Sequence, residues 1–303
     1  MGLQFIPHDT KIDFIGKKFI AFAISIFLTI GSIGVFVLSG INYGIDFTGG
    51  YVLEVRTPEK ADLSQMRKAL SDLQIGEVSL QEFGSPQDVL IRIPSFEGDA
   101  QARDTSLERV KSALGASVEI RRTETIGPKV GKELVENAIY AVVLSLLAIL
   151  IYIWIRFEWQ FAVCGVIALV HDCIVLLGLY SLCHSLEFNT NAVVSFLLTA
   201  SYSIHDTVVV YDRIRENMRK FKSMTFADII NLSMNETFSR TVLTTTTTLL
   251  ALLALCLFGG KVIAEFSCPL LVGFSVGAFS SVCLSAPLLL YTRLKTGEKE
   301  MQK

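Results

Sequence analysis

Long apolar stretches alternate with short polar segments along most of this 303-residue chain. The first stretch, residues 19–39, carries no charge and is long enough for a helix to cross a hydrocarbon core about 30 Å thick. A cleaved signal peptide is the alternative, but the stretch is longer than the apolar core of a typical signal peptide, and no clear small-residue cleavage site follows it. Five further stretches raise the predicted transmembrane helices to six: residues 138–155, 161–182, 192–211, 241–260 and 266–292.

One large polar segment, residues 40–133, interrupts this pattern after the first predicted helix. Its period-2 alternation, its turn residues and a capping box at Asp62 and Gln65 predict alternating strands and helices. The strands are expected at 51–56, 77–83, 88–93 and 117–125, the helices at 62–73 and 100–114, and a tight turn at 84–86. This βαββαβ order is that of a ferredoxin-like α+β domain. Such a sheet leaves one face free, and we favour a docking role for that face over direct contact with a moving polypeptide.

Composition agrees with a membrane protein, because 51% of residues are hydrophobic, 18% are charged and the mean hydropathy is +0.51. The chain has no strongly basic domain that would indicate nucleic-acid binding. All six cysteines lie in or beside apolar stretches, so their spacing predicts neither a disulfide framework nor a zinc site. No cofactor or metal is expected.

The clusters of basic residues at 11–18, 156, 213–222 and 293–299 all fall on the same side of the predicted helices, which predicts the orientation in a bacterial cytoplasmic membrane. Residues 1–18 and 293–303 are expected to be cytoplasmic, and residues 40–133 are expected to be exported. Helices two to six occupy 134–292, with a cytoplasmic amphipathic loop at 213–239. Within that loop, Thr225 and Asp228 form a plausible helix cap, and the apolar face of residues 226–238 suits either a membrane interface or ordinary packing.

The most informative residue is Asp206, near the end of the fourth apolar stretch. A carboxylate at membrane depth costs roughly 3 kcal/mol or more and normally marks an ion or proton pathway. Arg240 opens the fifth stretch and is the natural partner, because an approaching or departing arginine would switch the proton affinity of the acid. His205 and Tyr202 could extend a relay. The alternative is a static ion pair that only joins the two helices.

A second polar pair, His171 and Asp172, lies near the middle of the third stretch, and it could serve a relay or helix packing. Thr244 to Thr248 are expected to bond the carbonyls of the preceding turn or to reach a neighbouring helix, so packing is the favoured use of these residues.

Five motifs in order resemble the SecF family of bacterial protein-export membrane subunits, within the wider SecD/SecF family and RND superfamily. The motifs are Asp46-Phe47-Thr48-Gly49-Gly50, His171-Asp172, the run from Asp206 to Asn217, Arg240-Thr241 and Phe258-Gly259-Gly260. The resemblance covers nearly the whole chain. It implies an RND-like six-helix half-bundle, with Asp206 and Arg240 at the positions of the proton-coupling pair, and Asp46 to Gly50 joining the membrane and exported domains. The family commonly has asparagine and glycine where this chain has His205 and Ser201, and an imidazole can itself titrate.

The same resemblance implies partnership with SecD and the SecYEG translocon, an unfolded preprotein as substrate, and energy from the proton motive force, with no enzymatic activity. One alternative is half of an RND-type proton-coupled exporter of lipids or small molecules, which would be expected to have a larger exported region. Another is an intramembrane hydrolase, because residues 273–277 have the Gly-x-Ser-x-Gly spacing of a nucleophile elbow. The serine lies inside an apolar stretch, so close helix packing by the two glycines is the favoured interpretation.

Overall fold

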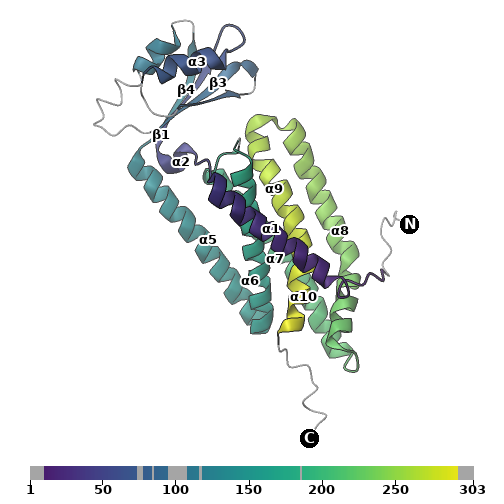
Figure 1. Ribbon diagram of the computed structural model, residues 1–303. Helices are drawn as coiled ribbons and strands as arrows, with labels where there is room; N and C mark the ends of the chain where they lie inside the picture. The colour runs from purple at the N-terminus through teal and green to yellow at the C-terminus, as the bar shows by residue number, and fades with distance from the viewer. Residues whose placement is uncertain are drawn as a thin grey trace. The chain divides into compact units, whose positions relative to one another are not determined.

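The computed structural model describes residues 10–73, 78–83, 85–94, 108–115, 118–184 and 186–292 (Figure 1). The chain forms two compact units, one of 43–140 with 187–190, and the other containing the rest. Within the described ranges, six helical segments are long and apolar enough to cross a membrane. The predicted fold class is confirmed: a six-helix membrane unit carries one small α+β domain. Residues 1–9 of the predicted N-terminal tail 1–18, the predicted C-terminal tail 293–303, and part of the helix expected at 100–114 lie outside the described residues.

Each long apolar stretch has become a helix that begins before its predicted first residue, because the polar residues ahead of it already join the helical hydrogen bonding. The helices are α1 (Lys18–Ser39), α5 (Pro128–Arg156), α6 (Trp159–Leu182), α7 (Thr190–Lys220), α8 (Phe226–Phe258) and α9 (Gly260–Ser280). After α9 the chain continues through a π-helical turn (Ser281–Ser285), α10 (Ala286–Leu288) and a 3₁₀ turn (Leu289–Tyr291). Helix α1 packs on α6, where Gly178 faces Ser32 so closely that a Cβ at residue 178 would overlap the serine.

The segment 213–239, predicted as an amphipathic loop, is helical over most of its length and belongs to two membrane helices. Residues 213–220 extend α7, and α8 begins at Phe226 with Thr225 as its N-cap: the Thr225 hydroxyl accepts the Asp228 amide at 3.2 Å. The apolar face of this segment packs inside the protein, since Ile229, Ile230 and Met234 are buried in the main core cluster of the membrane unit. Of the two uses considered for this face, the structure therefore shows ordinary packing.

One cysteine pair corrects the sequence analysis. Cys256, near the end of α8, and Cys268, in α9, form a disulfide with a Cα–Cα distance of 5.5 Å. The two helices are joined by a short turn at Gly259 and run side by side, so residues 12 apart in sequence become neighbours. Spacing alone could not reveal this pair, because it depends on where the turn falls.

The small domain is a four-stranded antiparallel sheet in the order β2-β3-β1-β4, the order of a ferredoxin-like fold. Its elements are β1 (Gly50–Arg56), α3 (Leu63–Ser71), β2 (Ser79–Phe83), β3 (Ser85–Pro94) and β4 (Glu119–Ile126), with helical residues 108–114 before β4. Asp62 caps α3 as predicted, accepting the amides of Ser64 and Gln65. Ser85 and Pro86, which the sequence placed in a turn at 84–86, lie in β3, and residue 84 is outside the described residues.

Inward-facing residues of the central strands close the core of this domain. Leu53 and Val55 of β1 and Val89, Ile91 and Ile93 of β3 are fully buried, with Leu70 of α3 against them. Most outward-facing residues of these strands are polar, with Val52 and Leu90 as the apolar exceptions, and Arg56 pairs with Asp88 across the two strands. The sheet thus has one apolar face under helix α3 and one charged face.

The Arg56–Asp88 pair gives the small domain an acid-sensitive contact. Arg56 donates through Nε and Nη2 to the two carboxylate oxygens at 2.6 Å each, and Ser85 adds a hydroxyl at 2.8 Å. The Arg56 hydrogen bonds lower the pKa of Asp88 to about 2, while partial burial opposes the shift. Because the folded-state pKa lies below the unfolded value, this stabilisation is present above about pH 4 and is lost as pH falls toward 2.

We therefore expect the opening free energy of β1 and β3 to fall between about pH 4 and pH 2, and to fall less in Asp88→Asn. Hydrogen exchange of the strand amides in the full-length protein measures this. The matched control is Asp62→Asn, which changes an exposed helix cap in the same domain. A pH dependence identical in wild type and Asp88→Asn would contradict the assignment.

Candidate functional site

Asp206 lies on α7 and is buried, with 4% of its surface exposed. Its Oδ2 atom has no hydrogen-bond partner among the described residues. The side chains of His205 and Arg240 act electrostatically on this carboxyl, and Arg240 does so from α8. A buried acid without a fixed bond, within range of a cation on another helix, is the arrangement expected of a group that gains and loses a proton.

Asp206 and Arg240 interact electrostatically, but they are not bonded to each other as the partners of a static ion pair would be. Within the described ranges, no hydrogen bond or ion pair joins the two side chains, and Arg240 and His205 are both exposed on the surface of the isolated chain. The interpretation as a permanent ion pair between α7 and α8 therefore has no geometric support here. An arginine that is not bonded to the acid has room to approach it and to withdraw.

Tyr202, one turn before Asp206, ties α7 to two other helices. Its hydroxyl donates to Thr245 Oγ1 of α8 at 3.1 Å, and its ring stacks on Phe274 of α9 with centroids 4.2 Å apart. Among the described contacts, none links Tyr202 to Asp206. The described contacts of Tyr202 are those of helix packing, and a relay through it stays a prediction.

The threonine-rich segment of α8 uses its hydroxyls mainly within the helix. Thr244 donates to the carbonyl of Arg240 at 3.0 Å, and Thr247 donates to that of Leu243 at 3.0 Å. Thr245 instead accepts the Tyr202 hydroxyl from α7. Both uses named from the sequence thus occur.

His171 and Asp172 form a second buried polar site in the membrane unit. Asp172 is 1% exposed, and its Oδ2 accepts the hydroxyls of Ser203 on α7 and Ser280 on α9, each at 2.7 Å. Its Oδ1 lies 3.0 Å from Nδ1 of His171. One carboxyl thus joins three helices, and Ser203, which lies three residues before Asp206 on α7, connects the two acidic positions along that helix.

Small residues bring α9 close enough to α7 for this contact. A Cβ at Gly273 would overlap Thr199, and one at Gly277 would lie 3.0 Å from the Ser203 Cβ. Ser275 lies between them in the middle of α9, where its hydroxyl donates to the Leu271 carbonyl at 2.7 Å. The nucleophile-elbow interpretation is therefore wrong: the segment is a continuous helix, and the two glycines allow close packing.

The Asp46–Gly50 motif connects the small domain to the start of α7. Asp46 belongs to the short helix α2 (Ile45–Thr48), and its Oδ2 accepts the backbone amide of Thr190, the first residue of α7, at 2.9 Å. A carboxylate at a helix N-terminus satisfies a free amide and complements the helix dipole. Gly49 and Gly50 then turn the chain into β1 with φ angles of 70° and 144°, which residues with a side chain rarely adopt.

Further contacts hold the segment 187–190 to the small domain. Gly44 donates its amide to the Phe188 carbonyl at 2.9 Å, and Arg92 of β3 forms an ion pair with Glu187. Near the start of α5, a Cβ at Gly131 would come within 2.9 Å of the Phe47 carbonyl oxygen and 3.2 Å of the Gly49 nitrogen. The motif is thus packed against the beginnings of two membrane helices.

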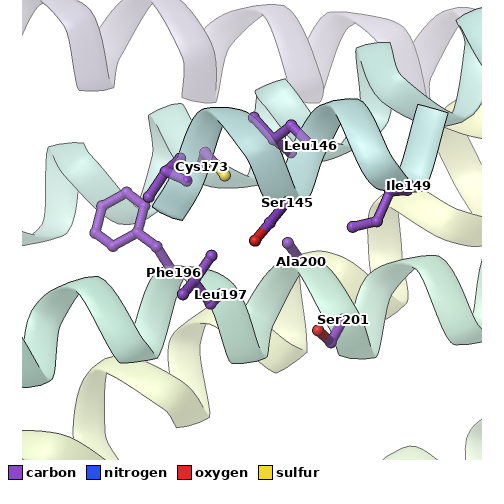
Figure 2. A pocket seen from close by; sticks show the side chains of 9 residues that line it. Ser145, Leu146, Ile149, Cys173, Phe196, Leu197, Ala200 and Ser201 are labelled. Carbon is purple, nitrogen blue, oxygen red and sulfur yellow. The ribbon is translucent and has the colours of Figure 1, made fainter. Parts of the chain in front are cut away.

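A small cavity of about 40 Å³ lies between α5, α6 and α7. Figure 2 shows Ser145 directed from α5 into this gap, toward Leu197 and Ala200 of α7, with Cys173 of α6 at its other side. Pockets for small-molecule substrates are typically about 300–1,000 Å³, and a few water molecules would fill this one. The cavity is therefore no substrate site.

Comparison with known proteins identifies the family. The model described as protein export membrane protein SecD/SecF, C-terminal, matches residues 106–295, and the SecD/SecF GG motif matches residues 34–57. The chain belongs to the SecD/SecF family of protein-export membrane proteins. The GG-motif match covers Asp46 to Gly50, so the segment that holds α7 is a recognised feature of the SecD/SecF family.

Relatives in the SecD/SecF family are similar over the full length. Protein translocase subunit SecF of Rickettsia felis is 43% identical over 309 residues, covering 99% of this chain and 98% of the relative. The subunit of the same description from Rickettsia bellii strain OSU 85-389 is 44% identical over 301 residues, covering 98% of each. These matches favour protein export over the small-molecule exporter considered from the sequence.

Two solved structures of SecDF share the fold. The crystal structure of SecDF from Thermus, described as a translocon-associated membrane protein, has a TM-score of 0.83 and 34% identity over 96% of this chain. SecDF in a super-membrane-facing form has a TM-score of 0.70 and 32% identity over 97% of this chain. The chain spans only 39% and 40% of those two longer proteins.

Sequence reasoning missed several residues of these sites. Ser203 and Ser280, which bond Asp172, and Gly131, which admits the Asp46–Gly50 motif, were not singled out. A signal existed for Ser203, since it lies one helical turn from Asp206 on the same face. Nothing in the pattern distinguished Ser280 from the other serines of its apolar stretch.

Proposed function

We propose that this chain works as the SecF-type accessory subunit of a Sec protein translocase and uses the proton motive force to assist preprotein export. The observation that carries the proposal is the buried, unbonded Asp206 carboxyl with Arg240 within electrostatic range on the next helix. Protonation removes the charge from Asp206 and with it the attraction of Arg240, so α7 and α8 would shift relative to each other as protons pass. The chain carries no nucleotide-binding loop in its sequence, which agrees with energy from a gradient.

Movement of α7 has a direct route to the small domain. Helix α7 runs without a break from Thr190, whose amide is held by Asp46, to Asp206 and beyond. At 1.5 Å per residue these 16 positions span about 24 Å. A shift set by the Asp206 proton therefore reaches the Asp46–Gly50 motif through one rigid element, and the small domain would change its position with each cycle.

We further propose that a SecD-type companion covers the exposed polar side of α7 and α8. His205, Arg240 and Thr244 are exposed in the isolated chain, although they belong to membrane-crossing helices. An uncovered arginine in the bilayer is costly, so such side chains normally face protein or water. The two SecDF structures, which are more than twice as long as the matched part, support a companion of this kind.

The proposed setting is a bacterial cytoplasmic membrane with both termini in the cytoplasm and residues 40–133 on the exported side. Basic residues beside the apolar stretches support this orientation. The SecYEG channel and an unfolded preprotein are the proposed partners on the transport path. The outer face of the small domain carries exposed charges on β4, such as Arg122 and Glu124, and these suit contact with a folded partner better than the burial of an apolar chain.

Cysteine crosslinking in native membranes tests this function through its companion. Thr244→Cys, on the exposed polar side of α8, is expected to crosslink to a SecD-type chain, which mass spectrometry of the adduct identifies. Phe27→Cys is the control, because Phe27 is 76% exposed on the apolar α1. We expect at least tenfold less of the same adduct from the control. Recovery of a small-molecule exporter subunit with Thr244→Cys, or equal adducts from both variants, would contradict the proposal.

A further inference from the structure

Asp172 and His171 are titratable groups that the coupling scheme above does not use. Both are buried on α6, at 1% and 6% exposure, and they face each other through Oδ1 and Nδ1 at 3.0 Å. Burying a charge in the middle of a membrane bundle for helix packing alone is expensive, since a serine or an asparagine would bond as well. We therefore expect Asp172 to have a role that only an ionisable carboxyl group can fill.

The geometry points to a second proton-binding site, and we propose that the His171–Asp172 pair takes up and releases one proton. Ser203 and Ser280 are both placed to donate to Oδ2 at 2.7 Å, and the Ser280 hydroxyl can also reach the Gly277 carbonyl at 3.2 Å. When both serines donate to Oδ2, Oδ1 is the oxygen that carries a proton, and it faces Nδ1 of the imidazole. The proposal stands on this arrangement and does not depend on Asp206 being the coupling acid.

The pair can bind a proton without losing any of these hydrogen bonds. In the deprotonated state, His171 is neutral, its Nδ1–H donates to the ionised Oδ1, and Nε2 holds a lone pair. An arriving proton forms an N–H bond at Nε2; the Nδ1–H proton then moves to Oδ1, so that Oδ1–H donates to Nδ1. The net charge of the pair changes from −1 to 0, and the contacts with α7 and α9 persist.

Two features of the structure point to a proton as the ligand. Nε2 of His171 is buried and has no hydrogen-bond partner among the described residues, so it can gain or lose a proton without breaking a bond. In addition, the π-helical turn Ser281–Ser285 begins immediately after Ser280. Such π-turns occur often at functional sites, and here one adjusts the helix directly beside the donor to Asp172.

Few other titratable groups lie on the elements packed against His171 and Asp172, so few could produce the pH-dependent signal expected of this pair. On α6 the neighbour is Cys173, and α7 presents His205 and Asp206 beyond Ser203. Helix α1 carries no charge between Phe19 and Ser39, α9 has Lys261 and Glu265 only in its first turns, and the π-turn contributes Cys283. The 3₁₀ turn adds Tyr291. Of the carboxyls named here, Asp206 lies only three residues from Ser203, a donor to Asp172, so its signal is the first to be separated from that of Asp172.

Infrared difference spectroscopy of the full-length protein with its companion, in lipid nanodiscs, separates the two acids. In Asp206→Asn, we expect a buried carboxyl C=O band to remain and to titrate with pH. The double variant Asp206→Asn/Asp172→Asn should lose one full carboxyl equivalent relative to it. If the two spectra have the same carboxyl bands over the whole pH range, the proposal is overturned, whether or not Asp206 couples export.

A conservative pair of variants keeps the test informative if Asp172→Asn does not fold. In the protonated state Oδ2 is the carbonyl oxygen, so Ser280→Ala removes one of its two hydrogen bonds and should shift the C=O band to higher frequency. Ser275→Ala is the matched control, since Ser275 lies on the same helix and bonds only the Leu271 carbonyl. A band that does not move in Ser280→Ala, or moves equally in Ser275→Ala, would refute the assignment to Asp172.

Discussion

Asp206→Asn is expected to abolish the proton-dependent part of preprotein export while leaving the amount of assembled protein unchanged. Asparagine has nearly the shape of aspartate, but it cannot take up or release a proton, so α7 and α8 would stay in one arrangement. We expect the stimulation of export by a proton gradient to fall at least tenfold, measured as the rate at which a preprotein becomes protected inside inverted membrane vesicles.

Asp212→Asn provides the matched control for this prediction. Asp212 lies on the same helix, is exposed, and pairs with Arg156 at 3.0 Å. Exposed pairs of this kind contribute about 0–1 kcal/mol, so export should remain within about twofold of wild type. If Asp206→Asn and Asp212→Asn reduced export equally, the loss would reflect general damage to α7. If neither reduced it, Asp206 would not be the coupling acid.

Gly131→Ala is expected to uncouple the small domain from the membrane unit. The added methyl carbon would lie 2.9 Å from the Phe47 carbonyl oxygen and 3.2 Å from the Gly49 nitrogen, and both are backbone atoms with little freedom to move. Overlap of this kind typically costs about 1–3 kcal/mol. The easiest relief is displacement of the Asp46–Gly50 motif, which would break the bond between Asp46 and the Thr190 amide.

The measurement is protease sensitivity of residues 43–50 in native membranes, combined with the export assay. We expect faster cleavage and at least fivefold lower gradient-dependent export in Gly131→Ala. Gly127→Ala is the control, because Gly127 lies four residues earlier and a methyl group there meets nothing within 4 Å. Wild-type behaviour of Gly131→Ala in both assays would show that this contact does not transmit motion.

The strong period-2 and apolar patterns made most of the architecture predictable. Six helices and the βαββαβ domain followed from them, because each element buries a face that its own sequence displays. The bounds were less predictable. Residues 226–239 were expected to form an amphipathic helix within a cytoplasmic segment separate from the membrane helices. They instead belong to α8, and residues 213–220 extend α7, because Ile229, Ile230 and Met234 pack into a core supplied by other helices.

The site was predictable where one charged residue lies in or beside an apolar stretch. Asp206, Asp172 and Arg240 stand out because charge is rare in apolar helices. Their partners were not predictable, since Ser280 meets Asp172 across 108 positions of sequence through the packing of three helices. The link from Asp46 to Thr190, 144 residues apart, likewise depends on how the loop before α7 meets the small domain. Contacts between residues so far apart in sequence cannot be inferred from the local pattern of polar and apolar positions.

Proton entry during export tests the central claim most directly. Vesicles with a trapped pH-sensitive dye, carrying the translocase with this chain and its companion, report proton movement when a preprotein is supplied. We predict proton flux that rises with export in wild type and in Asp212→Asn, and that is absent in Asp206→Asn. Equal export-dependent proton flux in Asp206→Asn and wild type would contradict the account.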